Sequence, residues 1–121
     1  MAYDEGLAER LRGVLHDEPG LSERRMFGGI AFLLGGRMCV GVMREDLMVR
    51  VGPEAQARLV RQEHARAMDF TGRPLKGFIY VSTQGYESDA DLQRWVGHAV
   101  AYVTALPPKK EKEKALRNKK R

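Results

Sequence analysis

The sequence predicts one α+β domain with the element order α-β-β-β-α-β-β-α and a mainly antiparallel five-stranded sheet. Two observations carry this prediction: the connections between neighbouring β-rich runs are short, and an amphipathic segment lies at each end of these runs. The 121 residues are 43% hydrophobic, which suits a single folded unit. We expect residues 1–106 to form the domain and residues 107–121 to form a basic, disordered tail.

The first element is a helix predicted over residues 3–17, where apolar side chains recur at helical spacing. Asp4 suits the N-cap because its side chain can accept a backbone N–H of the first turn. Pro19-Gly20 then marks a turn.

Three strands follow, predicted over residues 26–34, 37–43 and 46–51. Gly35-Gly36 between the first two is a hairpin signal, since primed turns need positive φ. Neither face of these strands reads as polar, although an antiparallel sheet with one wet face should alternate. Either the helices cover both faces or a second subunit covers one of them.

The second half of the chain is predicted to contain a helix, two strands and a last helix. Pro53 suits the start of a helix over residues 53–63, whose apolar face is thin. Strands are predicted over residues 67–70 and 77–82. The last helix begins near Ser88 with a capping-box-like Asp91 and ends before Pro107-Pro108. Its apolar stripe includes Trp95, which should lie buried against the sheet.

The positive charge of the chain is concentrated at its C-terminal end. Residues 106–121 contain eight Lys or Arg and two Glu, a net +6, so the total of +5 leaves 5 − 6 = −1 for residues 1–105. The tail is therefore the candidate nucleic-acid-binding segment, without preference between DNA and RNA, and a solubilising role is the alternative. Its cations are Lys109, Lys110, Lys112, Lys114, Arg117, Lys119, Lys120 and Arg121.

The sequence offers weak candidates for catalysis. Cys39 lies mid-strand, where a buried and inert thiol is expected. The three histidines lack metal-ligand spacing. Asp89 and Asp91 fall in the first turn of a helix, where the helix dipole explains them, and Asp69 is isolated beside a turn. We therefore expect no enzyme activity, no metal and no cofactor. The histidines are His16, His64 and His98.

A smaller basic feature is expected on the folded part. Arg24, Arg25 and Arg50 form a basic spot if their strands point them outward together. The favoured alternative is a solvated edge where they meet partners such as Glu23.

The first residues and the cysteine content indicate the cellular compartment of the protein. The first fifteen residues are too charged for a signal peptide, and no apolar run approaches a membrane span. A single cysteine cannot form an internal disulfide. We expect a cytoplasmic protein that does not enter a membrane.

A motif in the first strands resembles a known family. Arg25-Met26-Phe27-Gly28-Gly29, followed by Ala31-Phe32, Gly36 and Met38, is similar to the signature of the TfoX/Sxy N-terminal domain, found in bacterial competence regulators. The resemblance continues through the segments Leu47-Met48-Val49-Arg50-Val51, Phe70, Tyr80-Val81, and the helix with Leu92 and Trp95, covering about residues 3–106.

This resemblance implies a fold similar to that of secretion chaperones and a regulatory role without catalysis. Full-length competence regulators carry a second domain and act in transcription with the cyclic-AMP receptor protein. Two functions follow: a regulatory module that binds a protein or a second copy of itself, with nucleic-acid affinity from the tail, or a chaperone-like adaptor without a nucleic-acid role. The pentapeptide is either a binding loop or, as we favour, a structural segment with permissive glycines and Phe27 in the core.

Overall fold

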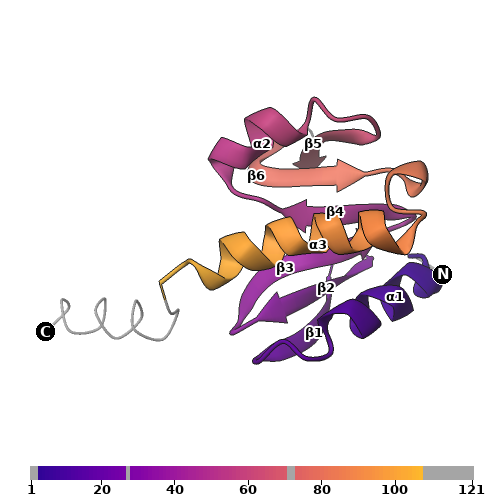
Figure 1. Ribbon diagram of the computed structural model, residues 1–121, viewed down its shortest axis with the longest axis vertical. Coiled ribbons are helices and arrows are strands. Elements are labelled where there is room, and N and C mark those ends of the chain that lie inside the picture. Colours follow the sequence, from indigo (N-terminus) through magenta and orange to yellow (C-terminus); the bar gives the residue numbers. More distant parts are fainter. Residues whose placement is uncertain (1–2, 27, 71–72, 108–121) are drawn as a thin grey trace, which may run out of the picture.

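The computed structural model describes residues 3–26, 28–70 and 73–107 (Figure 1). In these residues the helices are α1 (Glu5–Leu15), α2 (Pro53–Leu59) and α3 (Asp89–Thr104), with a short 3-10 helix η1 (Thr83–Gly85). The strands are β1 (Leu21–Met26), β2 (Gly29–Leu34), β3 (Arg37–Met43), β4 (Asp46–Arg50), β5 (Ala65–Phe70) and β6 (Arg73–Val81).

The strands form one sheet in the order β1-β2-β3-β4-β6-β5, and every neighbouring pair is antiparallel. The predicted α+β class and antiparallel sheet are confirmed, but the prediction of five strands is wrong. The run predicted as one strand over residues 26–34 is divided, because Met26 pairs with Gly29 across a turn and Gly28 has φ +77°. The strand before this turn begins at Leu21.

Several predicted boundaries also differ from the structure. The first helix spans Glu5–Leu15 rather than 3–17, and the second ends at Leu59 rather than 63 because the chain then turns toward His64, at φ +71°. The strands predicted over 67–70 and 77–82 begin earlier, at Ala65 and Arg73, because β5 and β6 pair along nearly their whole length. Side-chain composition alone does not reveal pairing of this kind.

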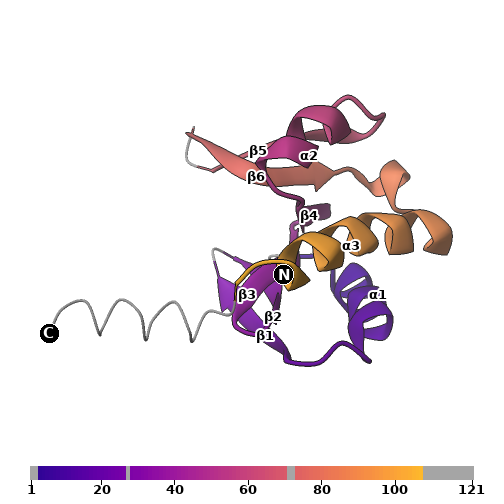
Figure 2. The ribbon, with the colours of Figure 1, turned by 60° about the vertical axis from the view of Figure 1, so that its left-hand side comes forward.

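The three helices lie on the same side of the sheet, which we call the covered face (Figures 1 and 2). Of the two alternatives for covering the sheet, cover of both faces by helices does not hold for the described residues, and cover of one face by a second subunit stays a prediction. Asp4 and Ser88 cap α1 and α3 as predicted, accepting N–H bonds from Leu7 and Asp91. Trp95 is 1% exposed, and its indole N–H donates to the Gly85 carbonyl at 3.0 Å, so the predicted burial is confirmed. A large hydrophobic core forms between these helices and the sheet. Its residues from the strands are Ile30, Phe32, Leu34, Cys39, Val40, Val42, Leu47, Val49, Ile79 and Val81.

The opposite side of the sheet has its own apolar cluster, to which no described helix contributes a buried residue. Figure 2 shows the β5–β6 hairpin diverging from β1–β3 on the side away from α1 and α3, so the sheet is bent around this surface. We call it the methionine face and define it by Met26, Ala31, Leu33, Met38, Met43, Met48, Met68, Phe78 and Tyr80.

Candidate functional site

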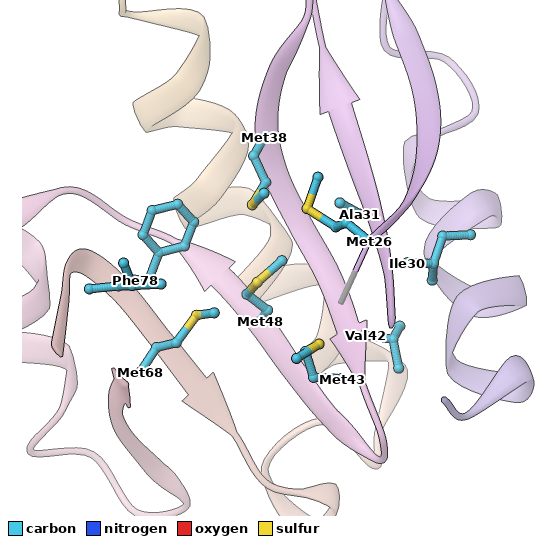
Figure 3. A pocket seen from close by; sticks show the side chains of 10 residues that line it. Met26, Ile30, Ala31, Met38, Val42, Met43, Met48, Met68 and Phe78 are labelled. Carbon is cyan, nitrogen blue, oxygen red and sulfur yellow. The ribbon is translucent and has the colours of Figure 1, made fainter. Parts of the chain in front are cut away.

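The methionine face contains a cavity of about 240 Å³ whose lining is apolar (Figure 3). Five of the six methionines of the chain line it, and they come from four different strands. Figure 3 shows their thioether side chains arranged around one hollow, with the Phe78 ring at its rim. The methionines are Met26, Met38, Met43, Met48 and Met68.

Alternation along β4 explains how one strand serves both faces. Leu47 and Val49 are fully buried on the covered face, whereas Met48 lies between them and points to the other side. Met48 pairs with Gly41 of β3, and a Cβ added to Gly41 would lie 2.5 Å from the Met48 methyl carbon. Glycine at position 41 therefore gives the long Met48 side chain room to lie across the neighbouring strand.

The pentapeptide that carries the family resemblance helps to build the same surface. Met26 lines the cavity, and a Cβ on Gly29 would come within 2.7 Å of the Met43 sulfur and 2.3 Å of the Val42 carbonyl oxygen. Gly28 occupies the turn at positive φ. The glycines thus have the structural role that we favoured, and Met26 adds a contact surface. Phe27, predicted to enter the core, lies outside the described residues.

Charged side chains accompany the apolar surface. Directly opposed residues of antiparallel strands share a face. Register therefore places Arg24 (opposite Ala31), Arg50 (opposite Phe78), Arg66 (opposite Tyr80) and Asp46 (opposite Met43) on the methionine face.

Two of these arginines lie against aromatic rings. The guanidinium carbon of Arg66 is 4.9 Å from the centroid of Tyr80, and its Nη2 is 2.7 Å from the Asp46 carboxylate. Arg50 lies 5.6 Å from the Phe78 centroid and 5.7 Å from that of Tyr102. These contacts hold cationic groups beside the apolar surface.

The predicted basic spot of Arg24, Arg25 and Arg50 does not form. Arg25 pairs with Ile30, a residue of the covered-face core, so it points away from Arg24. Arg50 lies three strands from β1, roughly 14 Å at the usual strand spacing.

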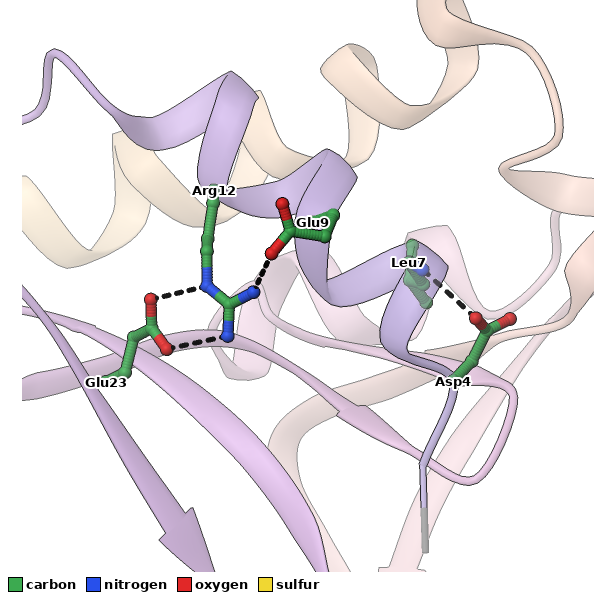
Figure 4. A network of polar contacts seen from close by, with 5 residues as sticks. All are labelled: Asp4, Leu7, Glu9, Arg12 and Glu23. Carbon is green, nitrogen blue, oxygen red and sulfur yellow. Dashed lines mark hydrogen bonds and ion pairs between the residues drawn. The ribbon is translucent and has the colours of Figure 1, made fainter. Parts of the chain in front are cut away.

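The alternative, a solvated edge, holds in part, because Arg24 and Arg25 are exposed on edge strand β1. Glu23, however, is not their partner. It accepts two hydrogen bonds from Arg12 of α1, at 2.7 and 3.0 Å (Figure 4). This ion pair fastens the first helix to the edge of the sheet.

Cys39 is fully buried in the covered-face core, as predicted. Burial raises the pKa of its thiol to about 12, with a smaller effect from Glu18, which opposes thiolate formation. A nucleophilic cysteine requires the reverse shift.

Local structure accounts for Asp89, Asp91 and His98, whereas the side chain of Asp69 lies outside the described part of the structure. Asp89 contacts Arg10 at 3.2 Å and Asp91 contacts Arg94 at 3.4 Å, both in the first turn of α3. Burial lowers the pKa of His98, which packs near Trp95 with ring centroids 6.1 Å apart. Across residues 3–26, 28–70 and 73–107 no group of three His, Cys, Asp or Glu is placed to hold a metal ion.

The proposed nucleic-acid-binding cations, Lys109 to Arg121, lie outside the described residues. Within the part of the chain that the structure describes, no helix is long and apolar enough to cross a membrane.

The sequence predicted that both faces of the sheet are apolar. That one of these faces is built largely from methionine was not predicted. The signal was available: five methionines fall between residues 26 and 68, all in segments with strand character. Their convergence required the strand order, which places β6 between β4 and β5.

Comparison with protein families matches residues 14–103 to the TfoX N-terminal domain. This match covers most of the chain, from the last residues of α1 nearly to the end of α3, and includes all six strands. The chain therefore belongs to the TfoX N-terminal domain family, as the sequence resemblance indicated. No curated protein matches it.

Proposed function

We propose that this domain is a regulatory module without catalytic activity that acts by binding a partner protein on its methionine face. The observation that carries the proposal is the unequal cover of the sheet: all three helices pack on one side, and an apolar cavity remains on the other. An apolar cavity of this kind is a candidate binding site even where most of its lining residues are largely buried. Family membership supports the regulatory role.

The cavity favours a protein partner over a small cofactor. Its volume of about 240 Å³ is below the roughly 300–1,000 Å³ of small-molecule sites, so it suits one or two side chains. Methionine is also suited to this task, because its unbranched thioether chain can repack around different contact surfaces.

Photo-methionine labelling in the host cell tests the proposal, since five of the six methionines line the cavity. We expect irradiation to crosslink the domain to a discrete partner through Met38 or Met43. Met43→Glu should remove the crosslink, because an unpaired carboxylate cannot enter an apolar contact without cost. Ala101→Glu adds the same charge at an exposed position of α3 and should leave it unchanged.

The regulatory half of the proposal has its own readout. Transcripts altered by deleting the gene should also be altered by Met43→Glu and not by Ala101→Glu, provided both variants keep the wild-type melting temperature. Transcript changes that are the same for both variants would separate the regulatory role from this surface.

The tail supports a second function, non-specific nucleic-acid binding, because its net +6 contrasts with −1 for residues 1–105. If it engages three to five phosphates, the log–log salt slope on duplex DNA should be about −3 to −4.5. Truncation after Pro108 should abolish binding and leave the melting temperature unchanged, as measured by fluorescence anisotropy at two salt concentrations and by thermal unfolding. Equal binding by the truncated chain would locate the affinity on the folded part instead.

A further inference from the structure

Building on the proposed binding function, we infer that the occupant of the methionine face is an amphipathic helix that carries acidic residues beside its apolar anchors. Three features of the described residues support this partner chemistry: the charge on the face, the hydrogen bonding of the sheet backbone beneath it, and the size of the cavity.

The charge of the face differs from that of the folded part as a whole. Four charged residues have a cross-strand partner on the methionine face. Three are arginines and one is an aspartate, so their net charge is 3 − 1 = +2. Residues 1–105 together carry −1. Positive charge is therefore concentrated here against the overall balance, and it is complementary to carboxylates on a partner.

Two of the three arginines are open to a new carboxylate. Arg24 is exposed and has no ion-pair partner among the described residues, and Arg50 contacts rings and the Met38 carbonyl but no described carboxylate. Arg66 is already paired with Asp46. Register places Arg24 of β1 and Arg50 of β4 on the methionine face without making either a lining residue of the cavity, and Arg50 lies at the end of β4, where it also contacts Tyr102 of α3. Carboxylates on both sides of an apolar stripe would meet these two arginines.

The backbone under the cavity favours a helix over an extended segment. β2, β3, β4 and residues 78–81 of β6 lie between paired strands, so the described floor of the sheet offers few free backbone hydrogen-bonding groups. An extended peptide laid on it would bury its own unpaired N–H and C=O groups. A helix satisfies these groups internally and presents only side chains.

The same features argue against nucleic acid as the occupant. Arg24 and Arg50 are three strand spacings apart, roughly 14 Å across the sheet, and the surface between them is lined by thioether and other apolar side chains. Phosphates would find no continuous track of donors there. Leucine-sized side chains, in contrast, suit a cavity of about 240 Å³.

The test uses the full chain and two synthetic peptides of about 18 residues, long enough to form a helix. Both carry the same leucine stripe, flanked by glutamates in one and by lysines in the other. We expect the glutamate peptide to bind at least about tenfold more tightly than the lysine peptide in fluorescence anisotropy, with the difference shrinking at high salt.

Neighbouring residues of β1 supply a matched pair of variants. Arg24→Glu should weaken binding of the glutamate peptide about three- to tenfold, because a favourable rim charge becomes a repulsive one. Arg25→Glu makes the same charge change at an equally exposed residue that points to the opposite face, and it should have no effect. Met43→Ala, a milder change than a charge in the cavity wall, should weaken binding of both peptides.

Other outcomes would overturn the inference and are distinguishable from failure of the proposed function. Equal binding of the two peptides, still sensitive to Met43→Ala, would leave a docking surface without acidic preference. Binding of neither peptide, with the photo-methionine crosslinks retained, would exclude an amphipathic helix. Crosslinks between two copies of this chain, with a dimer mass in light scattering, would assign the face to a second subunit. Duplex DNA displacing the glutamate peptide from the chain truncated after Pro108 would assign it to nucleic acid.

Discussion

The two faces of the sheet solve the problem of burying apolar surface in different ways. On the covered face, branched aliphatic residues such as Val40, Val49 and Ile79 pack against three helices and are fully buried. On the methionine face, Met48 and Met68 are nearly as buried although no described helix covers them, because the sheet is bent around them. Among the described residues, helices complete one face of the sheet, and the other face stays concave.

The side chains suit these two situations. β-branched residues have few rotamers and fill a fixed space with little entropy cost, as a permanent core requires. Methionine has three rotatable bonds and adapts its shape, at some loss of specificity in packing. Under the proposed function, stability and recognition are divided between the two sides of the same strands, residue by residue along β4.

The largest expected effect tests the stability side of this comparison. Trp95→Ala should cost about 3–5 kcal/mol in free energy of unfolding, because it removes the largest fully buried side chain between α3 and the sheet. It also leaves the Gly85 carbonyl without its indole donor. Urea denaturation measures this loss, and Trp95→Phe should cost less because it keeps most of the buried ring. A loss below about 1 kcal/mol for the alanine variant would mean that the covered face is not the stabilising core.

A paired truncation on the two faces sharpens the comparison directly. Leu47→Ala, at a fully buried residue of the covered face, should cost about 2–5 kcal/mol. Met38→Ala, at a half-buried residue of the cavity wall, should cost about 1 kcal/mol or less, because its side chain loses less contact area on truncation. Equal losses in urea denaturation would show that the methionine face is as much a structural core as the other.

The order of helices and most strands could be predicted from the sequence because each depends on local signals. Asp4 and Ser88 are N-cap residues that mark where α1 and α3 begin. The apolar stripe that contains Trp95 identifies the buried side of α3. The β1–β2 turn was missed because Gly28-Gly29 was interpreted as permissive glycines within one strand over residues 26–34 rather than as a hairpin turn like Gly35-Gly36. The similarity to secretion chaperones stays a prediction.

The site was less predictable than the fold, for a physical reason. That both faces are apolar is visible in the lack of apolar–polar alternation along single strands, but which face the helices cover depends on non-local packing. Arg24 and Arg25 illustrate the limit. They are neighbours in sequence and equally charged, yet register sends them to opposite faces, and the predicted basic spot required them together. Amino-acid composition does not determine the register in which two strands pair, and the register decides which face a side chain joins.

The smallest expected effect concerns the ion pair that fastens α1 to the covered face. The hydrogen bond from Arg12 lowers the pKa of Glu23, outweighing the opposing effect of burial, and the same contacts raise the pKa of Arg12 (Figure 4). A carboxylate with a lowered folded-state pKa stabilises the protein above its unfolded pKa of about 4.3, and this contribution is lost as the pH falls through the lowered folded value.

Glu23→Gln should therefore destabilise the protein at pH 7 and make progressively less difference as the pH falls below about 4.3. Both side chains are more than one-third exposed, so solvent screening limits the effect at pH 7 to about 1 kcal/mol or less. Urea denaturation of both proteins at pH 7 and at acid pH measures it. Glu9→Gln is the control, since Glu9 also contacts Arg12 but is 72% exposed and should matter less. A difference that does not change with pH would mean that the glutamine acts through packing, and α1 would then be held to the sheet by its leucines alone.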